Sequence, residues 1–556
     1  MKIHHSVQRF SPMYLIFNRW ILLPLLAMLP FFSAIQAQAQ QANPPKRWNI
    51  LWISAEDLSP DLGCYGDKYA RSPAIDQLAS QGARWTNAFS VAPVCAPSRS
   101  SIITGMFPTS IGSMHMRNQC VPPADVKCFP EYLRATGYYC SNNVKTDYQF
   151  EPPATAWDDI SNKAHWRNRR DKNQPFFAVF NFTTTHESQI RLEPEAFAKR
   201  TAALKPEERH KPEEARIPAY YPDTPIVRND WARYHDLITA MDKQVADILQ
   251  QLKDDGLADS TIVFFWGDHG RGLPRSKRWP YDSGTHVPML VRWPGVIKPG
   301  TVVNDLVTLM DLGPSVLKVA GLKVPAHMQA KPFLGPDGIT HDGRKYVFAH
   351  RDRMDETYDM IRTARDDRFR YVRNFQFRKP YAQFIAYMEE MPTMQEWRRL
   401  NKAGELKGPN ALFFQPEKPK EELYDIAADP DEVNNLAADP RYRDVVKSMR
   451  KAVTDWMDEI KDLGFVPEPT LNEQFRPGGK KQKTAGVLAR TEKTAEGQKI
   501  TLACPTPGAS IGWRKTGDPA KSWRLYTNPI EIKPGDTISI KACRIGFEDS
   551  PVMNFP

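Results

Sequence analysis

Several features are scarce or absent in this sequence of 556 residues. Beyond its N-terminal segment, no apolar run approaches the length of a transmembrane helix, which argues against a protein with several membrane spans. No zinc-finger spacing, nucleic-acid-reading helix or internal repeat is present, so we expect neither a nucleic-acid partner nor a solenoid. Cysteine accounts for only 7 residues, a number that is compatible with an oxidising compartment.

The overall composition is that of a large soluble protein. Hydrophobic residues make up 41% and charged residues 25%, and the length suits more than one domain. The formal charge of +10 and the pI near 9.0 suit a polyanionic partner, either nucleic acid or a sulfated sugar. Because basic and acidic residues are interspersed, a mildly basic globular protein explains the charge equally well.

The N-terminus has the layout of a signal peptide. Lys2, Arg9 and Arg19 precede an apolar run from Ile21 to Ile35, which is interrupted by prolines and followed by Ala37-Gln38-Ala39. The run is too short for a comfortable membrane span, so we expect no stable membrane insertion. We predict a signal peptide over residues 1–39 and export to the periplasm or the medium, with a retained anchor as the alternative.

The cysteines lie at positions 64, 95, 120, 128, 140, 504 and 543. An odd number in an exported protein leaves at least one thiol unpaired. We predict disulfides between Cys504 and Cys543 and between Cys120 and Cys128.

Three nearly continuous apolar runs indicate strands buried on both faces of a mainly parallel sheet. They cover residues 49–54, 176–182 and 261–266 and are followed by Glu56-Asp57, His186 and Asp268-His269 respectively. Helical patterns at 72–81 and 230–254 lie between them. The alternation predicts an α/β domain over residues 45–335, with polar side chains beyond the strand ends, where open α/β sheets place their sites.

The rest of the chain changes character. An aromatic and arginine-rich run at 369–374 and a helical stretch at 442–461 predict a smaller α+β subdomain over residues 336–470. A linker rich in Gly, Lys and Gln follows at 471–484. Alternating segments at 499–502 and 537–541, separated by Pro/Gly turns, predict an all-β sandwich module over residues 485–556.

An acidic cluster forms if the first and third of these strands are neighbours. Glu56, Asp57, Asp268 and His269 then converge, and such oxygen-rich sets hold a divalent cation such as calcium. Taken separately, each acidic pair is equally consistent with a turn or a helix cap.

A basic group comprises Arg99, Lys145, Lys277, His115 and His186. Isolated lysines are usually solvated and isolated histidines usually structural. Beside a metal, however, these cations would bind an anionic group such as sulfate or phosphate.

Cys95 is open to three interpretations: a structural thiol, a nucleophile, or a residue that is converted to something else. A nucleophilic thiolate needs a nearby base and an electropositive setting. Arg99 lies about one helical turn away, and Pro97 suits the first position of a helix over residues 97–105, whose N-terminus would attract anions.

Cys95-Ala96-Pro97-Ser98-Arg99, continued to Thr104-Gly105, resembles the sulfatase signature, and the resemblance extends over about residues 47–440. Further matching stretches are Gly267–Gly270, Tyr281–Gly284 and Glu422–Asp425. The resemblance implies the alkaline-phosphatase-like fold, a mixed, mostly parallel sheet with helices on both faces. The tail resembles a chitobiase C-terminal-like β-sandwich module, which would be a spacer or contact carbohydrate.

The resemblance also implies a mechanism. A maturation enzyme would oxidise Cys95 to formylglycine (3-oxoalanine), whose hydrate attacks sulfur with one hydroxyl and expels sulfate by deprotonation of the other. One Ca²⁺ per chain would be held by Glu56, Asp57, Cys95, Asp268 and His269. Arg99 would steady the aldehyde hydrate, while Lys145, His186 and Lys277 would bind sulfate or protonate the leaving oxygen.

Three positions depart from the family pattern. Glu56 stands where Asp is common, and His269 stands where Asn is frequent. Asp147 stands where a histidine is expected, and either Asp147 itself or a histidine from elsewhere, such as His115, would take over its role.

The expected function is that of an exported sulfatase acting on a sulfated polysaccharide or its oligosaccharides, with ulvan-type and heparan-type polymers as candidates. Predicted substrate contacts are His115, Arg117, Asp147, Arg351 and Arg353. The alternatives are a phosphoesterase of the same superfamily and an inactive secreted carbohydrate-binding protein.

Overall fold

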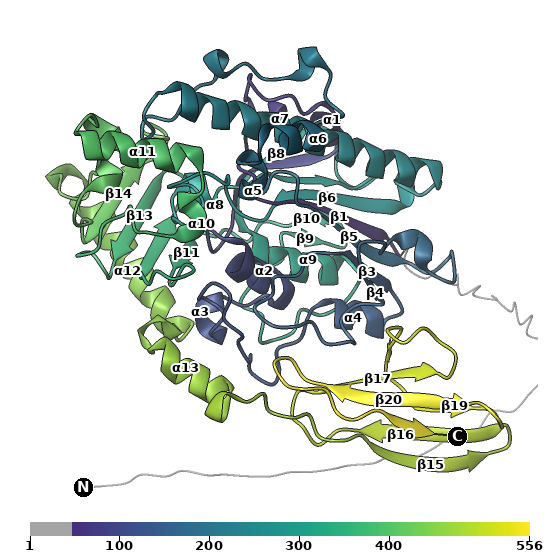
Figure 1. The fold of residues 1–556 in the computed structure, drawn as a ribbon. Helices are drawn as coiled ribbons and strands as arrows, with labels where there is room; N and C mark the ends of the chain where they lie inside the picture. The colour runs from purple at the N-terminus through teal and green to yellow at the C-terminus, as the bar shows by residue number, and fades with distance from the viewer. Residues whose placement is uncertain (1–46, 556) are drawn as a thin grey trace, which may run out of the picture. The chain divides into compact units, whose positions relative to one another are not determined.

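The computed structural model describes residues 47–555, which fall within one compact unit (Figure 1). The predicted signal peptide lies outside the described residues. Within residues 47–555, no helix combines the length and apolar character needed to cross a membrane.

An eight-stranded sheet lies at the centre of the α/β domain, in the order β4-β3-β5-β1-β6-β7-β2-β8. Its strands are β1 (Asn49–Ala55), β2 (Ala83–Phe89), β3 (Tyr139–Asn143), β4 (Asp159–Ile160), β5 (Phe176–Phe182), β6 (Thr261–Gly267), β7 (Met289–Arg292) and β8 (Thr301–Thr308). β7 is antiparallel to its neighbours β6 and β2, and the other pairings are parallel. The predicted mixed, mostly parallel sheet is therefore confirmed.

Helices cover both faces of this sheet because successive strand residues point to opposite sides. Leu51 and Ile53 pack with α1 (Pro73–Ser80) and α7 (Pro225–Asp254) on one face. Ile50 and Trp52 pack with α2 (Cys95–Thr104), α4 (Pro130–Ala135) and α9 (Leu312–Val319) on the other. Figure 1 shows α7 running along one side of the strands and α2, α4 and α9 on the opposite side.

Two predicted helices begin earlier than expected. α2 begins at Cys95, so Pro97 occupies the third helical position, where its missing N–H has no partner in the helix in any case. α7 begins at Pro225, and the Thr224 side chain caps it by accepting a hydrogen bond from the Val227 N–H at 3.4 Å.

A second, antiparallel sheet follows in the order β11-β12-β13-β14. Its strands are β11 (Val347–Arg351), β12 (Ile361–Arg365), β13 (Phe369–Asn374) and β14 (Glu421–Asp425). One face packs against α12 (Arg443–Glu459) through Met449, Trp456, Tyr371 and Leu423. The shorter elements are α3 (Pro108–Ile111), α5 (Glu187–Ile190), α6 (Pro194–Arg200), α8 (Asp282–Thr285), β9 (Leu334–Gly335), β10 (Gly338–Ile339), α10 (Ala386–Glu389), α11 (Pro392–Ala403) and α13 (Glu468–Phe475).

The C-terminal module consists of two antiparallel sheets around one apolar core. One sheet has the order β15-β16-β19, and the other β18-β17-β20-β21. The strands are β15 (Leu488–Thr494), β16 (Gly497–Ala503), β17 (Ser510–Lys515), β18 (Arg524–Leu525), β19 (Ile530–Ile532), β20 (Ile538–Cys543) and β21 (Met553–Phe555). Ile500 and Leu502 of one sheet pack with Ile511, Ile538 and Ile540 of the other. The predicted additional β module is present.

The predicted disulfides are wrong, because all seven cysteines are free thiols. Cys120 and Cys128 are fully buried in the apolar core beside Phe129. Cys504 Sγ donates to the Ala485 carbonyl at 3.4 Å, and burial raises the pKa of the Cys543 thiol to about 12.

Candidate active site

Three neighbouring strands end at the same edge of the central sheet. Ala55 of β1 pairs with both Phe182 of β5 and Gly267 of β6, so the residues that follow these strands converge. The Asp57 N–H donates to Asp268 Oδ1 at 3.0 Å, which joins two loops that are far apart in the sequence. The convergence expected from the apolar runs is confirmed.

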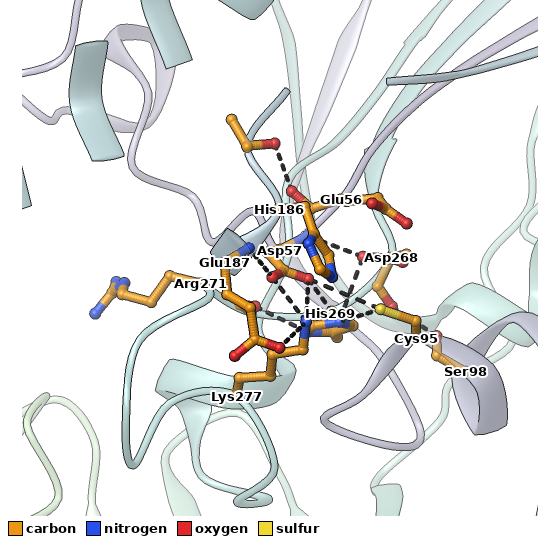
Figure 2. A network of polar contacts seen from close by, with 12 residues as sticks. Glu56, Asp57, Cys95, Ser98, His186, Glu187, Asp268, His269, Arg271 and Lys277 are labelled. Carbon is orange, nitrogen blue, oxygen red and sulfur yellow. Dashed lines mark hydrogen bonds and ion pairs between the residues drawn. The ribbon is translucent and has the colours of Figure 1, made fainter. Parts of the chain in front are cut away.

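Cys95 lies at the first position of α2 and faces this edge (Figure 2). Its Sγ is 3.2 Å from His269 Nε2 and 3.9 Å from Asp57 Oδ1. Ser98, in the same helix, donates from its hydroxyl to the Asp268 carbonyl at 2.6 Å. That bond fixes the start of α2 against the loop after β6, with Cys95 2% exposed.

Asp57 is the centre of the polar network. Lys277 Nζ lies 2.9 and 2.8 Å from its two carboxylate oxygens, and the Glu187 N–H donates to Oδ2 at 2.7 Å. His269 Nε2 lies 3.0 Å from Oδ1. Burial raises the pKa of Asp57, but the Lys277 ammonium and the His269 imidazole outweigh it and hold the pKa well below its usual range.

Glu56 lies beside two cations. Lys145 forms an ion pair with its carboxylate, and Arg99 Nη2 lies 3.8 Å away. Burial is the main reason that the pKa of Glu56 rises to about 7. Lys145 Nζ also lies 3.1 Å from Asp147 Oδ2, so this ammonium bridges two carboxylates.

Arg99 connects α2 to the strand ends. Its Nε donates to Asp268 Oδ2 at 2.9 Å and its Nη1 to Asn181 Oδ1 at 2.8 Å. The guanidinium is 3% exposed, and these two bonds fix its plane next to Cys95.

The orientation of His269 is set by its backbone partner. Nδ1 lies 2.9 Å from the Gly270 carbonyl and must donate to it, which directs Nε2 toward Asp57 and Cys95. Burial alone would lower the pKa of His269, but Asp268, Cys95 and Asp57 raise it to about 10. A divalent cation would take the place of the proton on this nitrogen.

The donor set fits such a cation. Ligand atoms of Cys95, Asp268 and His269 lie within 4.8 Å of one another, and so do those of Asp57, Cys95 and His186. The carboxylates of Asp57 and Asp268 are fully buried, as expected of groups whose charge a metal would balance.

His186 and Lys277 line the cavity together with Cys95. His186 Nδ1 accepts the Ser188 N–H at 3.3 Å, which leaves the proton on Nε2. Burial and the Lys277 ammonium lower the pKa of His186, so the ring is neutral near pH 7. Figure 2 shows its imidazole directed toward Cys95 and Asp57.

The site opens into a cavity of about 540 Å³. Its wall includes Cys95 and the predicted residues Lys145, Asp147, His186 and Lys277, together with Arg117, whose side chain is 70% exposed. The concentration of cations around Cys95 suits an anionic substrate.

Three predicted substrate contacts do not line this cavity, because the structure uses them elsewhere. His115 Nδ1 accepts the Arg353 N–H at 3.3 Å. Arg353 forms a two-point ion pair with Glu468. Arg351 is fully buried, donates to the Arg278 carbonyl at 2.7 Å and stacks on Trp279, so it supports the cavity wall from behind.

Sequence reasoning missed Asn181, Glu187 and Arg278. Arg278 lines the cavity and donates two hydrogen bonds, of 2.8 and 2.9 Å, to the carboxylate of Glu187. Glu187 also forms an ion pair of 2.8 Å with Lys277 and so lies between the two cations. Arg278 directly follows Lys277 and Glu187 directly follows His186, and this adjacency to predicted site residues is the sequence signal that would have identified them. Segments of the linker and the C-terminal module also reach the cavity, and nothing in their sequence indicated this.

Comparisons with known proteins agree with this geometry. The Sulfatase family model matches residues 48–164 and 139–322, and the model for the C-terminal part of N-sulphoglucosamine sulphohydrolase matches residues 267–381. An ulvan-active sulfatase of Formosa agariphila is 39% identical, over 93% of this chain and 92% of its own.

Solved structures share the fold at low identity. A protein solved in complex with its substrate, D-glucosamine-2-N, 6-O-disulfate, aligns with a TM-score of 0.54 at 19% identity. The alignment covers 76% of this chain and 99% of that protein. A phosphonate monoester hydrolase from Silicibacter pomeroyi aligns with a TM-score of 0.54 at 18% identity, and the alignment covers 76% of this chain and 97% of the hydrolase. At such identities the likeness concerns the fold alone, which serves more than one kind of ester.

Proposed function

The chain belongs to the sulfatase family of sulfuric ester hydrolases, and we propose that it releases sulfate from a sulfated polysaccharide or its oligosaccharides. The observation that carries this proposal is the cavity in which Cys95 is surrounded by Lys145, Lys277 and Arg278. An ulvan-type polymer is the first candidate, because the relative that matches almost the whole chain is named for its action on ulvan. Heparan-type glycosaminoglycans are the second.

We propose further that Cys95 is converted to formylglycine by a maturation enzyme. The Sγ of the thiol marks the place that the aldehyde oxygen would take, 3.2 Å from His269 Nε2. The hydrated aldehyde would supply one hydroxyl to attack sulfur and a second to release sulfate. Conversion would also remove one thiol from an odd set of seven.

A Ca²⁺ ion is proposed beside Cys95, held by Asp57, Asp268 and His269 with Glu56 near by. Such an ion would lower the pKa of a bound hydroxyl and neutralise sulfate oxygens. The carboxylates are already fixed by the strand ends, so little rearrangement is needed to bind it.

The remaining side chains have separate tasks. Arg99 is held by Asp268 and Asn181 and steadies the reacting group at Cys95. Lys277 and Lys145 supply positive charge to the sulfate oxygens. His186 is neutral and carries its proton on Nε2, so it can donate that proton to the leaving sugar oxygen.

Asp147 occupies the sequence position at which a histidine was expected. His115 is bound beneath Arg353 and does not line the cavity, whereas Asp147 lines it and contacts Lys145. We propose that Asp147 acts by positioning Lys145.

Export is proposed from the N-terminal pattern of residues 1–39, since a polysaccharide too large to enter the cell is degraded outside the cytoplasm. Localisation of the full-length protein in cell fractions tests this point separately from the activity.

The activity is tested with protein in which conversion of Cys95 has been verified by peptide mass. Sulfate release from ulvan and heparan oligosaccharides is compared with hydrolysis of 4-nitrophenyl sulfate and 4-nitrophenyl phosphate. We expect sulfate release, with Cys95→Ala inactive and the control Cys504→Ala fully active. Full activity with an unmodified thiol, or preference for the phosphate ester, would overturn the proposal.

A further inference from the structure

Part of the cavity wall comes from the C-terminal segments of the chain. Arg476, which follows α13, and Lys481 of the linker line the same cavity as Cys95. Gly546 and Phe547, in the turn that follows β20, also line it. A role as a spacer alone does not account for module residues in the wall of the reaction cavity.

The module is held firmly against the catalytic part by buried polar contacts. Arg544 Nη2 donates to the Pro122 carbonyl at 2.6 Å, and Lys127 Nζ donates to the Gly508 carbonyl at 2.7 Å. Arg134 Nη2 donates to the Trp523 carbonyl at 2.6 Å. The contacts of Arg544 and Arg134 are buried, so separating the two parts would break these hydrogen bonds and return their donors and acceptors to water.

The turn that lines the cavity is packed closely against the catalytic part. Ile545 is 3% exposed and belongs to the apolar core of the catalytic part. Gly546 has φ +80°, and a Cβ there would lie 2.7 Å from Val121 Cγ2, so this close approach requires glycine. Phe547 is thereby held at the cavity wall as a rigid, partly exposed ring.

The two basic residues of this wall are available to a ligand. Lys481 Nζ has Glu151 at 3.4 Å, but the Glu151 side chain is 89% exposed, and such a pair is weak. Arg476 Nε is buried and, within residues 47–555, has no hydrogen-bond partner. The residue as a whole is half-buried and lines the cavity, so a ligand in the cavity can contact its side chain.

These cations are additional to those needed for the reaction. Lys277 and Lys145 are bound to carboxylates beside Cys95 and serve the sulfate that is released. Arg476 and Lys481 do not contact that network, so their charge suits a second anionic group on the same substrate. An aromatic ring beside them suits the C–H face of a sugar.

We propose that Arg476, Lys481 and Phe547 form a second subsite, which binds the neighbouring anionic sugar of the substrate chain. Phe547 stacks on the sugar ring, while Arg476 and Lys481 bind its carboxylate or sulfate. This inference rests on the proposed function and deepens it, because the module then selects an oligosaccharide over a small sulfate ester.

The test compares two substrates for each variant: a sulfated ulvan or heparan tetrasaccharide and 4-nitrophenyl sulfate. For Arg476→Gln, Lys481→Gln and Phe547→Ala we expect kcat/KM on the tetrasaccharide to fall about tenfold, mainly through KM, since each removes one charge-assisted bond or one stacking contact. Activity on 4-nitrophenyl sulfate should stay unchanged. Lys480→Gln, in the same linker, and Leu488→Ala, an exposed apolar residue of the module, are the matched controls.

The outcomes separate the two proposals. If the converted wild-type enzyme releases no sulfate from either substrate, the proposed function fails. If the wild type is active and the variants retain full activity on the tetrasaccharide, the subsite is overturned while the function stands. An equal loss on both substrates also overturns it, because that result indicates a structural role, which thermal melting of the variants would reveal.

Discussion

Lys277 Nζ lies 2.9 and 2.8 Å from the two carboxylate oxygens of Asp57, and both side chains are almost completely buried. The ammonium also lies 2.8 Å from Glu187 Oε1. One cation therefore balances two buried carboxylates at the edge of the reaction cavity. Its removal affects both stability and activity.

Lys277→Gln leaves Asp57 and Glu187 without this counter-charge, although Arg278 still pairs with Glu187. We expect the free energy of unfolding to fall by about 3 kcal/mol, as for other broken buried pairs. Sulfate release should fall by about two orders of magnitude, because a cation beside the substrate is lost. Urea unfolding and sulfate-release kinetics measure the two effects. The exposed Lys298→Gln is the control, and an unchanged unfolding midpoint for Lys277→Gln would contradict the pairing described here.

Removal of the proposed metal gives a second prediction. A chelator should lower the thermal midpoint, and excess Ca²⁺ should restore it, because a ligand that binds only the folded state adds about 3 kcal/mol at about 100 times its Kd. Asp268→Asn should abolish this Ca²⁺-dependent shift, whereas Asp259→Asn, whose side chain is 92% exposed, should retain it. A thermal midpoint that does not respond to chelator or calcium in the wild type would count against the metal site.

The buried carboxylate of Asp352 predicts a dependence of stability on pH. Burial raises its pKa, but Arg362 and the hydrogen bond from His350 outweigh this and hold the pKa at about 2, against an ordinary value of 3.8. A depressed pKa contributes stability that is present above pH 3.8 and is lost as the pH falls toward 2. The shift corresponds to about 2 kcal/mol.

Asp352→Asn should therefore be less stable than the wild type by about 2 kcal/mol or more at pH 7. The difference in the free energy of unfolding between the wild type and the variant should narrow as the pH falls below 3.8. Urea unfolding at pH 7, 3.5 and 2.5 measures it, with the exposed Asp337→Asn as the control. A difference that is the same at every pH would show that Asp352 contributes through packing rather than charge.

The central sheet could be predicted well from the sequence because each buried strand is a short, nearly continuous run of apolar residues. β1, β5 and β6 each lie within one residue of the expected range, and their ends carry the polar residues that meet at the site. The sequence signature around Cys95 allowed the family to be predicted. The individual roles of Arg99, Lys145, His186 and Lys277 came from that resemblance and not from spacing.

Long-range pairing was not predictable from one sequence. Arg351 and Arg353 were expected to bind substrate, but Arg353 is paired with Glu468 and Arg351 is fully buried behind the cavity wall. An arginine's partner depends on the tertiary fold, which the local sequence does not encode. That Phe547 lines the same cavity as Cys95 is equally invisible in the sequence, because it results from docking of the whole module.

Asp147 gives the last prediction, at the position where a histidine was expected. Asp147 Oδ2 lies 3.1 Å from Lys145 Nζ, and Lys145 is also paired with Glu56, so we infer that Asp147 holds the ammonium between the two carboxylates. Asp147 has φ +50°, which asparagine also tolerates, so Asp147→Asn removes the charge without straining the backbone.

We expect Asp147→Asn to reduce kcat/KM for a sulfated oligosaccharide about tenfold, as the loss of one charge-assisted contact to Lys145 implies. If Asp147 only positions Lys145, the pH profile of kcat should keep its shape in the variant. If Asp147 is instead a general base, its replacement should abolish the acid limb of the profile. Steady-state kinetics from pH 5 to 9 distinguish these results, with Asp337→Asn as the control. Loss of the acid limb would show that the carboxylate itself accepts a proton in the reaction.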